Sequence, residues 1–208
     1  MGATMIERPH TSLVEWAVAG VPLRAGTESG DLHVVAAFDG GVLVGAIDGL
    51  GHGPDAAEAA RVAADVLQEH AAEPPARLLG RCHDALRSTR GAVLTLASID
   101  GRRGSMTWAG VGNVEGMLLR IDPAAPHESA PLRGGIVGLR LPPCRESTIT
   151  VVPADILVLT TDGILHGASG GLDRSASAAS IAEAVLAAHR NPSDDALVVV
   201  ARYVGPRS

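Results

Sequence analysis

One feature limits the possible folds and functions of this chain more than any other. It is a carboxylate that directly follows an apolar strand and precedes a glycine-rich turn. Residues 42–47 are apolar throughout and predict a strand, and Asp48 comes directly after it. Glycine then occupies every second position from 49 to 53, and Pro54 opens an alanine-rich helix. We expect these glycines to adopt positive φ and to leave backbone polar groups open to a small charged ligand. The stretch therefore predicts a ligand-binding turn between a strand and a helix.

The sequence favours a metal ion over a phosphate group as the direct ligand of this turn. A phosphate-binding Walker loop needs a lysine, and all 17 basic residues of this chain are arginine. A dinucleotide fingerprint places glycines directly after the strand, where this chain has Asp48. A hard cation with oxygen ligands agrees better with the residues present. A plain strand-to-helix turn with a capping aspartate remains the alternative at this point.

Length and composition limit the class of protein. The 208 residues fit one domain, 1–208, in which we expect residues 1–11 to be poorly ordered. Apolar residues make up 46% of the chain but aromatic residues only 2%, so the core must be built from aliphatic side chains. No apolar run approaches the ~20 residues of a membrane helix, and the net charge of −6 argues against nucleic acid as a partner. Two cysteines, Cys82 and Cys144, make no disulfide framework and predict a cytoplasmic protein.

A second aspartate is expected beside Asp48. Residues 31–38 predict another strand, and the segment 39–41 (Asp-Gly-Gly) is typical of a hairpin turn. In an antiparallel hairpin the start of one strand lies beside the end of its partner. Asp31 and Asp48 should therefore meet at one end of the sheet.

The remaining pattern alternates strands and helices and predicts an α+β sandwich. Strands are expected at residues 12–19, 92–99, 104–109, 114–121, 147–152, 155–160 and 196–203, helices at 55–70, 76–88 and 175–189, and a long loop at 122–146. Further acidic residues lie at two strand ends: Asp162 follows the strand at 155–160, and Asp194 and Asp195 precede the last strand. Carboxylates therefore mark four strand ends.

Such a group of aspartates predicts a pair of divalent cations. Crowded carboxylates repel one another, and hard cations such as Mg²⁺ or Mn²⁺ relieve this repulsion. Two such ions can hold a hydroxide between them and stabilise an in-line phosphoryl displacement. A cysteine-phosphatase loop is excluded because the spacing from Cys82 to Arg87 is one residue too short. The scattered histidines and cysteines give no zinc-ligand spacing.

The ordered set of motifs resembles the type 2C metal-dependent protein serine/threonine phosphatases, in their compact bacterial SpoIIE/RsbX-like branch. The resemblance is carried by Ser29-Gly30-Asp31, residues 48–53, Gly110–Asn113, Thr160-Thr161-Asp162-Gly163 within residues 153–164, and Asp194-Asp195-Ala196. These segments follow the order of the family and span most of the chain. The specificity lies in the ordered set rather than in any single motif.

The resemblance implies an α-β-β-α four-layer sandwich of two mainly antiparallel sheets, with metals between the sheets. It implies that Asp48 bridges two metal ions and that the carbonyl of Gly49 binds one of them. Asp162 and Asp194 would bind the other ion, and Asp31 would act directly or through water. Asp194 is chosen over its neighbour because the family uses the first acid of that pair.

The chain differs from the family pattern in the segments expected around this site. Residues 122–146 are too few to form the large lid subdomain of bigger members. The phosphate-binding arginine of those members has Arg24 as its nearest counterpart. His52 has a side chain whose ordinary pKa suits a general acid. A turn histidine that only forms hydrogen bonds with the backbone agrees with the sequence at least as well. His166 is expected to be a surface loop residue.

The implied function is that of a cytoplasmic enzyme that needs two divalent metal ions, Mn²⁺ or Mg²⁺. It would remove phosphate from phosphoserine or phosphothreonine of a bacterial partner-switching or stressosome protein by attack of a metal-bridging water. The partner would be that phosphorylated protein, of the stressosome or anti-sigma antagonist type, with no role for nucleic acid or membrane. Two alternatives remain: a non-catalytic, partner-binding protein of the same fold, and a metal-dependent phosphohydrolase of a small metabolite.

Overall fold

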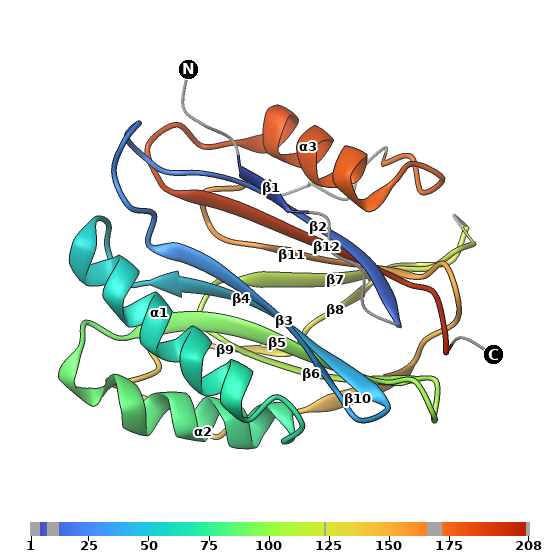
Figure 1. Ribbon diagram of the computed structural model, residues 1–208, viewed down its shortest axis with the longest axis horizontal. Helices are drawn as coiled ribbons and strands as arrows, with labels where there is room; N and C mark the ends of the chain where they lie inside the picture. Colours follow the sequence, from blue (N-terminus) through green and yellow to red (C-terminus); the bar gives the residue numbers. More distant parts are fainter. Residues whose placement is uncertain (1–4, 8–12, 123, 166–171, 207–208) are drawn as a thin grey trace.

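Two mainly antiparallel sheets packed face to face form the centre of the computed structural model, which describes residues 5–7, 13–122, 124–165 and 172–206 (Figure 1). The first sheet has the order β1 (Met5–Glu7), β2 (Val14–Val21), β12 (Ala196–Tyr203), β11 (Ile156–Thr160), β7 (Glu115–Leu119) and β8 (Glu128–Ser129). The second has the order β10 (Ser147–Thr150), β6 (Ser105–Val111), β5 (Ala92–Asp100), β4 (Gly41–Gly49) and β3 (Asp31–Phe38). A short strand, β9 (Leu132–Arg133), pairs parallel with β6.

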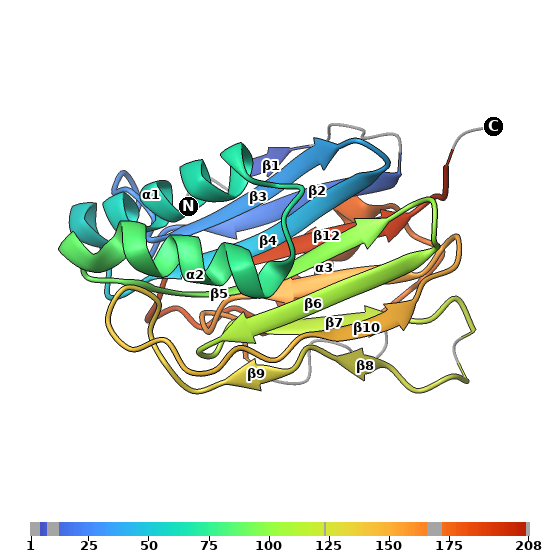
Figure 2. The same cartoon turned by 90° about the horizontal axis from the view of Figure 1, so that it is seen from below.

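Helices cover the outer faces of both sheets. α1 (Pro54–Glu69) and α2 (Pro75–Ala85), followed by a 3₁₀ turn at Leu86–Ser88, pack on the second sheet, as Figure 2 shows from below. α3 (Ala178–His189) packs on the first sheet. The expected α-β-β-α four-layer sandwich is therefore confirmed. None of the described helices combines the length and the apolar character that a membrane crossing requires.

Aliphatic and alanine side chains build the layers, as the composition requires. The space between the sheets is filled by Val, Leu, Ile and Ala from both inner faces, together with the buried Trp16 and Trp108. Seven residues of α1 are buried, and six of them are alanine. Such small side chains let the helix lie close against β3 and β4. The first turn of the helix, at Ala56, lies directly against Gly49 at the end of β4.

The segment 122–146 is more regular than the loop that we expected. It contains β8, which pairs with β7 of the first sheet, and β9, which pairs with β6 of the second. Two-residue strands are too short to show an alternating pattern, so they could not be predicted from the sequence. The described part of this segment follows the edges of both sheets and forms no lid subdomain.

The N-terminal segment that we expected to be poorly ordered contains one strand. β1 pairs antiparallel with β2. Residues 1–4 and 8–12 lie outside the described residues. The remaining expected strands and helices agree with the structure to within a few residues. The largest differences are of three residues: α3 starts at Ala178 instead of 175, and α2 ends at Ala85 instead of 88, where the 3₁₀ turn continues it.

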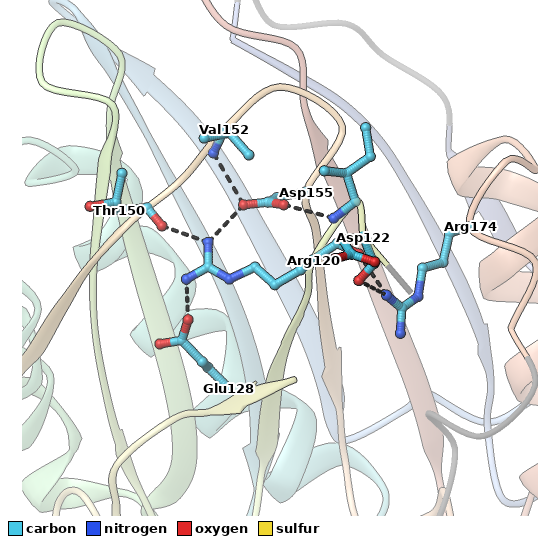
Figure 3. A network of polar contacts seen from close by, with 8 residues as sticks. Arg120, Asp122, Glu128, Thr150, Val152, Asp155 and Arg174 are labelled. Carbon is cyan, nitrogen blue, oxygen red and sulfur yellow. Dashed lines mark hydrogen bonds and ion pairs between the residues drawn. The ribbon is translucent and has the colours of Figure 1, made fainter. Parts of the chain in front are cut away.

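A partly buried polar network joins the two sheets at one end of the sandwich (Figure 3). Arg120, directly after β7, donates hydrogen bonds to the carbonyl of Thr150 at 2.7 Å and to the carboxylate of Asp155 at 2.8 Å. It also forms an ion pair with Glu128. Asp155 is fully buried and accepts further bonds from the amides of Ile121 and Val152. Because every polar group of this aspartate has a partner, its burial is compensated.

Candidate metal centre

The hairpin formed by β3 and β4 brings the first two aspartates together. Asp31 and Asp48 are direct partners in the antiparallel register. The turn that joins the strands contains Gly40, which has φ 74°. At the aspartate end, the amide of Gly49 donates a 3.0 Å hydrogen bond to the carbonyl of Gly30, which extends the pairing beyond the strands. The predicted hairpin, with both carboxylates at one end, is thus confirmed.

The other acidic residues reach the same end of the molecule from the first sheet. β11 and β12 are antiparallel, so Asp162, which follows β11, lies at the same end as Asp194 and Asp195, which precede β12. Hydrogen bonds connect this end of one sheet with that of the other. The hydroxyl of Thr161 donates to the carboxylate of Asp31 at 2.6 Å. All four strand ends therefore converge at one end of the sandwich.

The two acids of the last turn have different surroundings. Asp195 is only 3% exposed, and its carboxylate accepts hydrogen bonds from the amides of Leu23 at 2.6 Å and Gly30 at 2.8 Å. Asp194 is more exposed, and its carboxylate accepts a hydrogen bond from the amide of the following residue at 2.9 Å. Asp195 thus fastens the loop between β2 and β3, whereas Asp194 keeps oxygen lone pairs for another partner.

Two glycines of this site are required for close packing rather than for positive φ. A Cβ at Gly49 would lie 2.0 Å from the carbonyl oxygen of Ala56, in the first turn of α1, and one at Gly163 would lie 1.8 Å from the carbonyl oxygen of Asp195. Our expectation that all three glycines of the 49–53 turn adopt positive φ is therefore wrong for Gly49. It holds for the other two, with φ 95° at Gly51 and 78° at Gly53. The helix approaches too closely for any side chain at position 49.

Gly30 leaves space beside the carbonyl that we expect to bind metal. A Cβ at this position would lie 3.3 Å from the carbonyl oxygen of Gly49 and equally close to a carboxylate oxygen of Asp195. It would also lie 2.9 Å from the Cβ of Ala56. The glycine of the Ser-Gly-Asp motif thus keeps the Gly49 carbonyl uncrowded.

The carboxylates at this end disturb one another electrostatically. Burial and the neighbouring carboxylates, first that of Asp162, raise the pKa of the Asp48 carboxyl to about 8. Burial followed by the charge of Asp48 raises the pKa of Asp31 well above its ordinary value, and the hydrogen bond from Thr161 acts in the opposite direction. Burial also raises the pKa of Asp194. A raised pKa means that the ionised carboxylate is disfavoured, and a bound cation would stabilise that ionised form.

The donor set fits hard divalent cations. Asp31, Asp48, Asp162 and Asp194, with the carbonyl of Gly49, offer only oxygen, which Mg²⁺ and Mn²⁺ prefer. In the described residues, however, no three His, Cys, Asp or Glu side chains are grouped tightly enough to form a finished metal site. Metal binding would therefore draw the carboxylates together. The assignment of each aspartate to a metal stays a prediction.

Two other polar residues border the carboxylates. The side-chain amide of Asn113 donates to the carboxylate of Asp162 at 2.8 Å. His52 is exposed and lies close enough to Asp194 for its charge to lower the pKa of that acid. Its role as a general acid stays a prediction, and His166 lies outside the described residues. A pocket of about 330 Å³ is lined by His52 and Asp195, and another of about 150 Å³ is lined by Asn113 and Asp162.

Sequence reasoning missed how some of these residues are used. It quoted Thr161 and Asn113 only as parts of motifs and gave Asp195 no separate role. A buried polar residue next to a candidate ligand would have been the signal for Thr161, but burial becomes visible only in the fold. The contacts of Asp195 with Leu23 and Gly30 join residues more than 160 positions apart in the chain, and local patterns do not show such contacts.

Comparisons of this sequence with known proteins agree on one family. Residues 39–204 match the family described as stage II sporulation protein E (SpoIIE). The phosphoserine phosphatase RsbX of Bacillus subtilis is 26% identical to this chain over 135 residues, which cover 65% of this chain and 67% of that protein.

Solved structures show the same fold. The crystal structure of RsbX in complex with magnesium superposes with a TM-score of 0.85 and 21% identity, covering 96% of this chain and 100% of that chain. A second solved structure superposes with a TM-score of 0.82 and 26% identity, covering 91% of this chain and 99% of that chain. It comes from work that describes the bacterial stressosome as a modular system adapted to control secondary messenger signaling. The PP2C phosphatase domain of SpoIIE from Bacillus subtilis gives 0.71 and 16% identity, covering 100% and 71%.

Proposed function

This chain belongs to the SpoIIE family of protein serine/threonine phosphatases, and from that premise we propose that it removes phosphate from a phosphorylated bacterial signalling protein. The substrate would be phosphoserine or phosphothreonine of a partner-switching or stressosome component in the cytoplasm. Two divalent cations, Mn²⁺ or Mg²⁺, would assist the reaction. The relatives support this substrate class, since one is a phosphoserine phosphatase and another comes from work on the stressosome.

The observation that carries the proposal is the convergence of carboxylates from four strand ends of two sheets. Asp31 and Asp48 are register partners in the second sheet, and Asp162 and Asp194 lie at the matching end of the first. A structural role alone would not explain so many acids at one place, because burial, together with the charges of the neighbouring carboxylates, raises the pKa values of Asp31, Asp48 and Asp194 and disfavours their ionised forms. A site that holds cations does explain them.

The residues around the cations would have distinct tasks. Divalent cations bound there would neutralise the phosphate charge and polarise water for in-line attack on phosphorus. Asp48, with the Gly49 carbonyl, would hold the ions together, and Asp31 would be kept in place by Thr161. Asp162 and Asp194 would complete the ligand set. His52, exposed beside Asp194, would hold the proton that the departing serine oxygen takes up.

A phosphate-release assay on phosphorylated candidate proteins tests this function. We expect wild-type protein to release phosphate from a phosphorylated stressosome or anti-sigma antagonist protein when Mn²⁺ is present, and to stop when a chelator is added. Asp48→Asn should abolish the release. Tight binding of the phosphoprotein without any release at saturating Mn²⁺ would identify a non-catalytic partner-binding protein instead.

A further inference from the structure

A pocket of about 330 Å³ lies beside the candidate metal centre, between the loop that joins β2 to β3 and the start of α1. Its walls include Arg24, His52, Arg90 and Asp195. The carboxylates of Asp48, Asp162 and Asp194 do not line it. The pocket is therefore adjacent to the predicted metal ligands without being part of them.

Arg90 lines this pocket. Its guanidinium forms an ion pair of 2.7 Å with the carboxylate of Asp55, in the first turn of α1. It also lies against the glycine-rich turn, because a Cβ at Gly51 would be 3.1 Å from one of its nitrogens. The guanidinium has five N–H donors, and the ion pair engages only one edge of it. The rest can bind an anion that enters the pocket.

Arg24 also lines the pocket, on a loop that is anchored to the metal end. The carbonyl of Arg24 accepts hydrogen bonds from the hydroxyl of Thr27 at 2.7 Å and from its amide at 3.2 Å, which closes a turn. The preceding amide, that of Leu23, is bound by the buried carboxylate of Asp195. The Arg24 side chain is exposed, and it makes no ion pair with the described part of the chain. A second arginine is thus available for a ligand.

Two guanidinium groups give the pocket donors for an anion, although the whole chain carries a net charge of −6. The lone pairs of Asp195 are already engaged by two backbone amides, and the carboxylate of Asp55 is paired with Arg90. Arg24 and the free edge of Arg90 are therefore the donors that an entering anion would meet. Planar guanidinium groups suit the two oxygens of a carboxylate. The reacting phosphate, in contrast, would bind at the metal ions.

We propose that this pocket is a second anion-binding subsite, which holds an acidic side chain of the substrate protein next to the residue that is dephosphorylated. The proposal rests on the proposed phosphatase function. His52 lines the pocket and also lies near Asp194, so the polypeptide next to a phosphoserine bound at the carboxylates can extend into the pocket. Arg24 and Arg90 then bind an aspartate or glutamate of that polypeptide and position the phosphoserine.

Two phosphoserine peptides that differ only in the flanking residues, glutamate or glutamine, test the subsite by kinetics. Wild-type protein should prefer the glutamate peptide by about 10-fold in kcat/KM. Arg24→Ala and Arg90→Ala should each remove most of this preference, and Arg24→Lys should keep part of it. Arg87→Ala is the matched control, because this exposed arginine pairs with Asp84 and does not line the pocket. Hydrolysis of a small aryl phosphate, which has no flanking acid to lose, should fall less than peptide hydrolysis in Arg24→Ala and Arg90→Ala and should be unchanged in Arg87→Ala.

A binding measurement separates failure of the subsite from failure of the phosphatase function. In metal-free protein, the NMR signals of the Arg24 and Arg90 side-chain Nε–H groups should shift when the unphosphorylated glutamate peptide is added, and not with the glutamine peptide. This readout requires no catalysis, so it stands even if wild-type protein hydrolyses no phosphopeptide. Equal shifts with both peptides would overturn the proposal. So would an equal loss of aryl phosphate hydrolysis in the arginine variants, because the arginines would then bind the reacting phosphate.

Discussion

The hydroxyl of Thr161 donates a 2.6 Å hydrogen bond to the carboxylate of Asp31, and the two residues belong to different sheets. The same hydroxyl accepts a 2.9 Å hydrogen bond from the amide of Leu197 in β12. Thr161 is 2% exposed and Asp31 is 6% exposed, so neither group can exchange its partner for bulk water. The orientation of a predicted metal ligand is thus controlled by a threonine of the opposite sheet.

Replacing Thr161 by valine should weaken metal binding. Valine has a similar shape but cannot orient the Asp31 carboxylate, and loss of such a supporting contact typically lowers metal affinity 10–100-fold. We expect Mn²⁺ affinity, measured by calorimetry, to fall by at least about 10-fold, whereas Thr161→Ser should stay close to wild type. An unchanged affinity in Thr161→Val would show that Asp31 does not depend on this bond.

Neutralising Asp48 or Asp162 should abolish phosphatase activity without unfolding the protein. Asp48→Asn removes a carboxylate that its neighbours and burial already destabilise, so the metal-free variant should melt no lower than wild type. Added Mn²⁺ should raise the Tm of the variant less than that of wild type. Near-normal turnover of Asp48→Asn at saturating metal would refute the bridging assignment.

The adjacent acids Asp194 and Asp195 should respond differently to substitution. Asp195→Ala leaves the buried amides of Leu23 and Gly30 without their acceptor, which should lower the Tm of metal-free protein by at least about 4 °C. Asp194→Asn should leave that Tm unchanged but reduce the affinity for Mn²⁺. Thermal melts and calorimetry on both variants measure the two effects. The opposite pattern, with Asp195 controlling metal affinity, would reverse the assignment.

Metal-free protein should lose stability as the pH rises. The pKa of Asp48 is raised to about 8 in the folded state, and that of Asp31 is raised as well, so the folded protein binds these protons more tightly than the unfolded chain does. Their protonation stabilises the fold fully below the ordinary aspartate pKa, and this stabilisation is lost as the pH rises through about 8. Thermal melts in chelator between about pH 5 and 9 should show a decline that is smaller in Asp48→Asn. Identical pH profiles would contradict the role of Asp48.

A phosphoprotein should be a far better substrate than a small aryl phosphate. The described part of residues 122–146 follows the sheet edges through β8 and β9, so no lid from this segment encloses the metal end. Contacts with the surface of a protein substrate can then position its phosphoserine. We expect kcat/KM on the cognate phosphoprotein to be at least ~100-fold higher, which corresponds to about 2.7 kcal/mol. Comparable values at matched Mn²⁺ would favour the metabolite phosphohydrolase alternative.

Much of this architecture could be predicted because its signals are local. The hairpin between β3 and β4 is encoded by Asp39-Gly40-Gly41 between two apolar runs, and it alone is sufficient to place Asp31 beside Asp48. The strand that ends before Asp162 is apolar on both faces, as a strand covered by a helix and a second sheet should be.

Other features could not be predicted because they depend on distant contacts. The dipeptide Asp-Gly occurs at 48–49 and at 162–163 and led to the same expectation at both places. The two glycines, however, avoid clashes with different neighbours: Gly49 with α1, and Gly163 with the backbone of Asp195. Nothing local distinguishes Asp194 from Asp195 either. The distinction arises because the second side chain turns into the fold, where Leu23 and Gly30 present their amides.

The network around Arg120 has a consequence for how such a protein can diversify. It fastens β7 to β10 at the end of the sandwich opposite the aspartates, where Arg120 reaches the carbonyl of Thr150 and the buried Asp155. The sheets are therefore held together at that end by contacts remote from the aspartates. Loops at the aspartate end, such as the one that carries Arg24, could then differ in sequence while the sandwich stays the same, provided that the amides of Leu23 and Gly30 still meet Asp195. Related chains could in this way acquire separate phosphoprotein targets without rebuilding the scaffold.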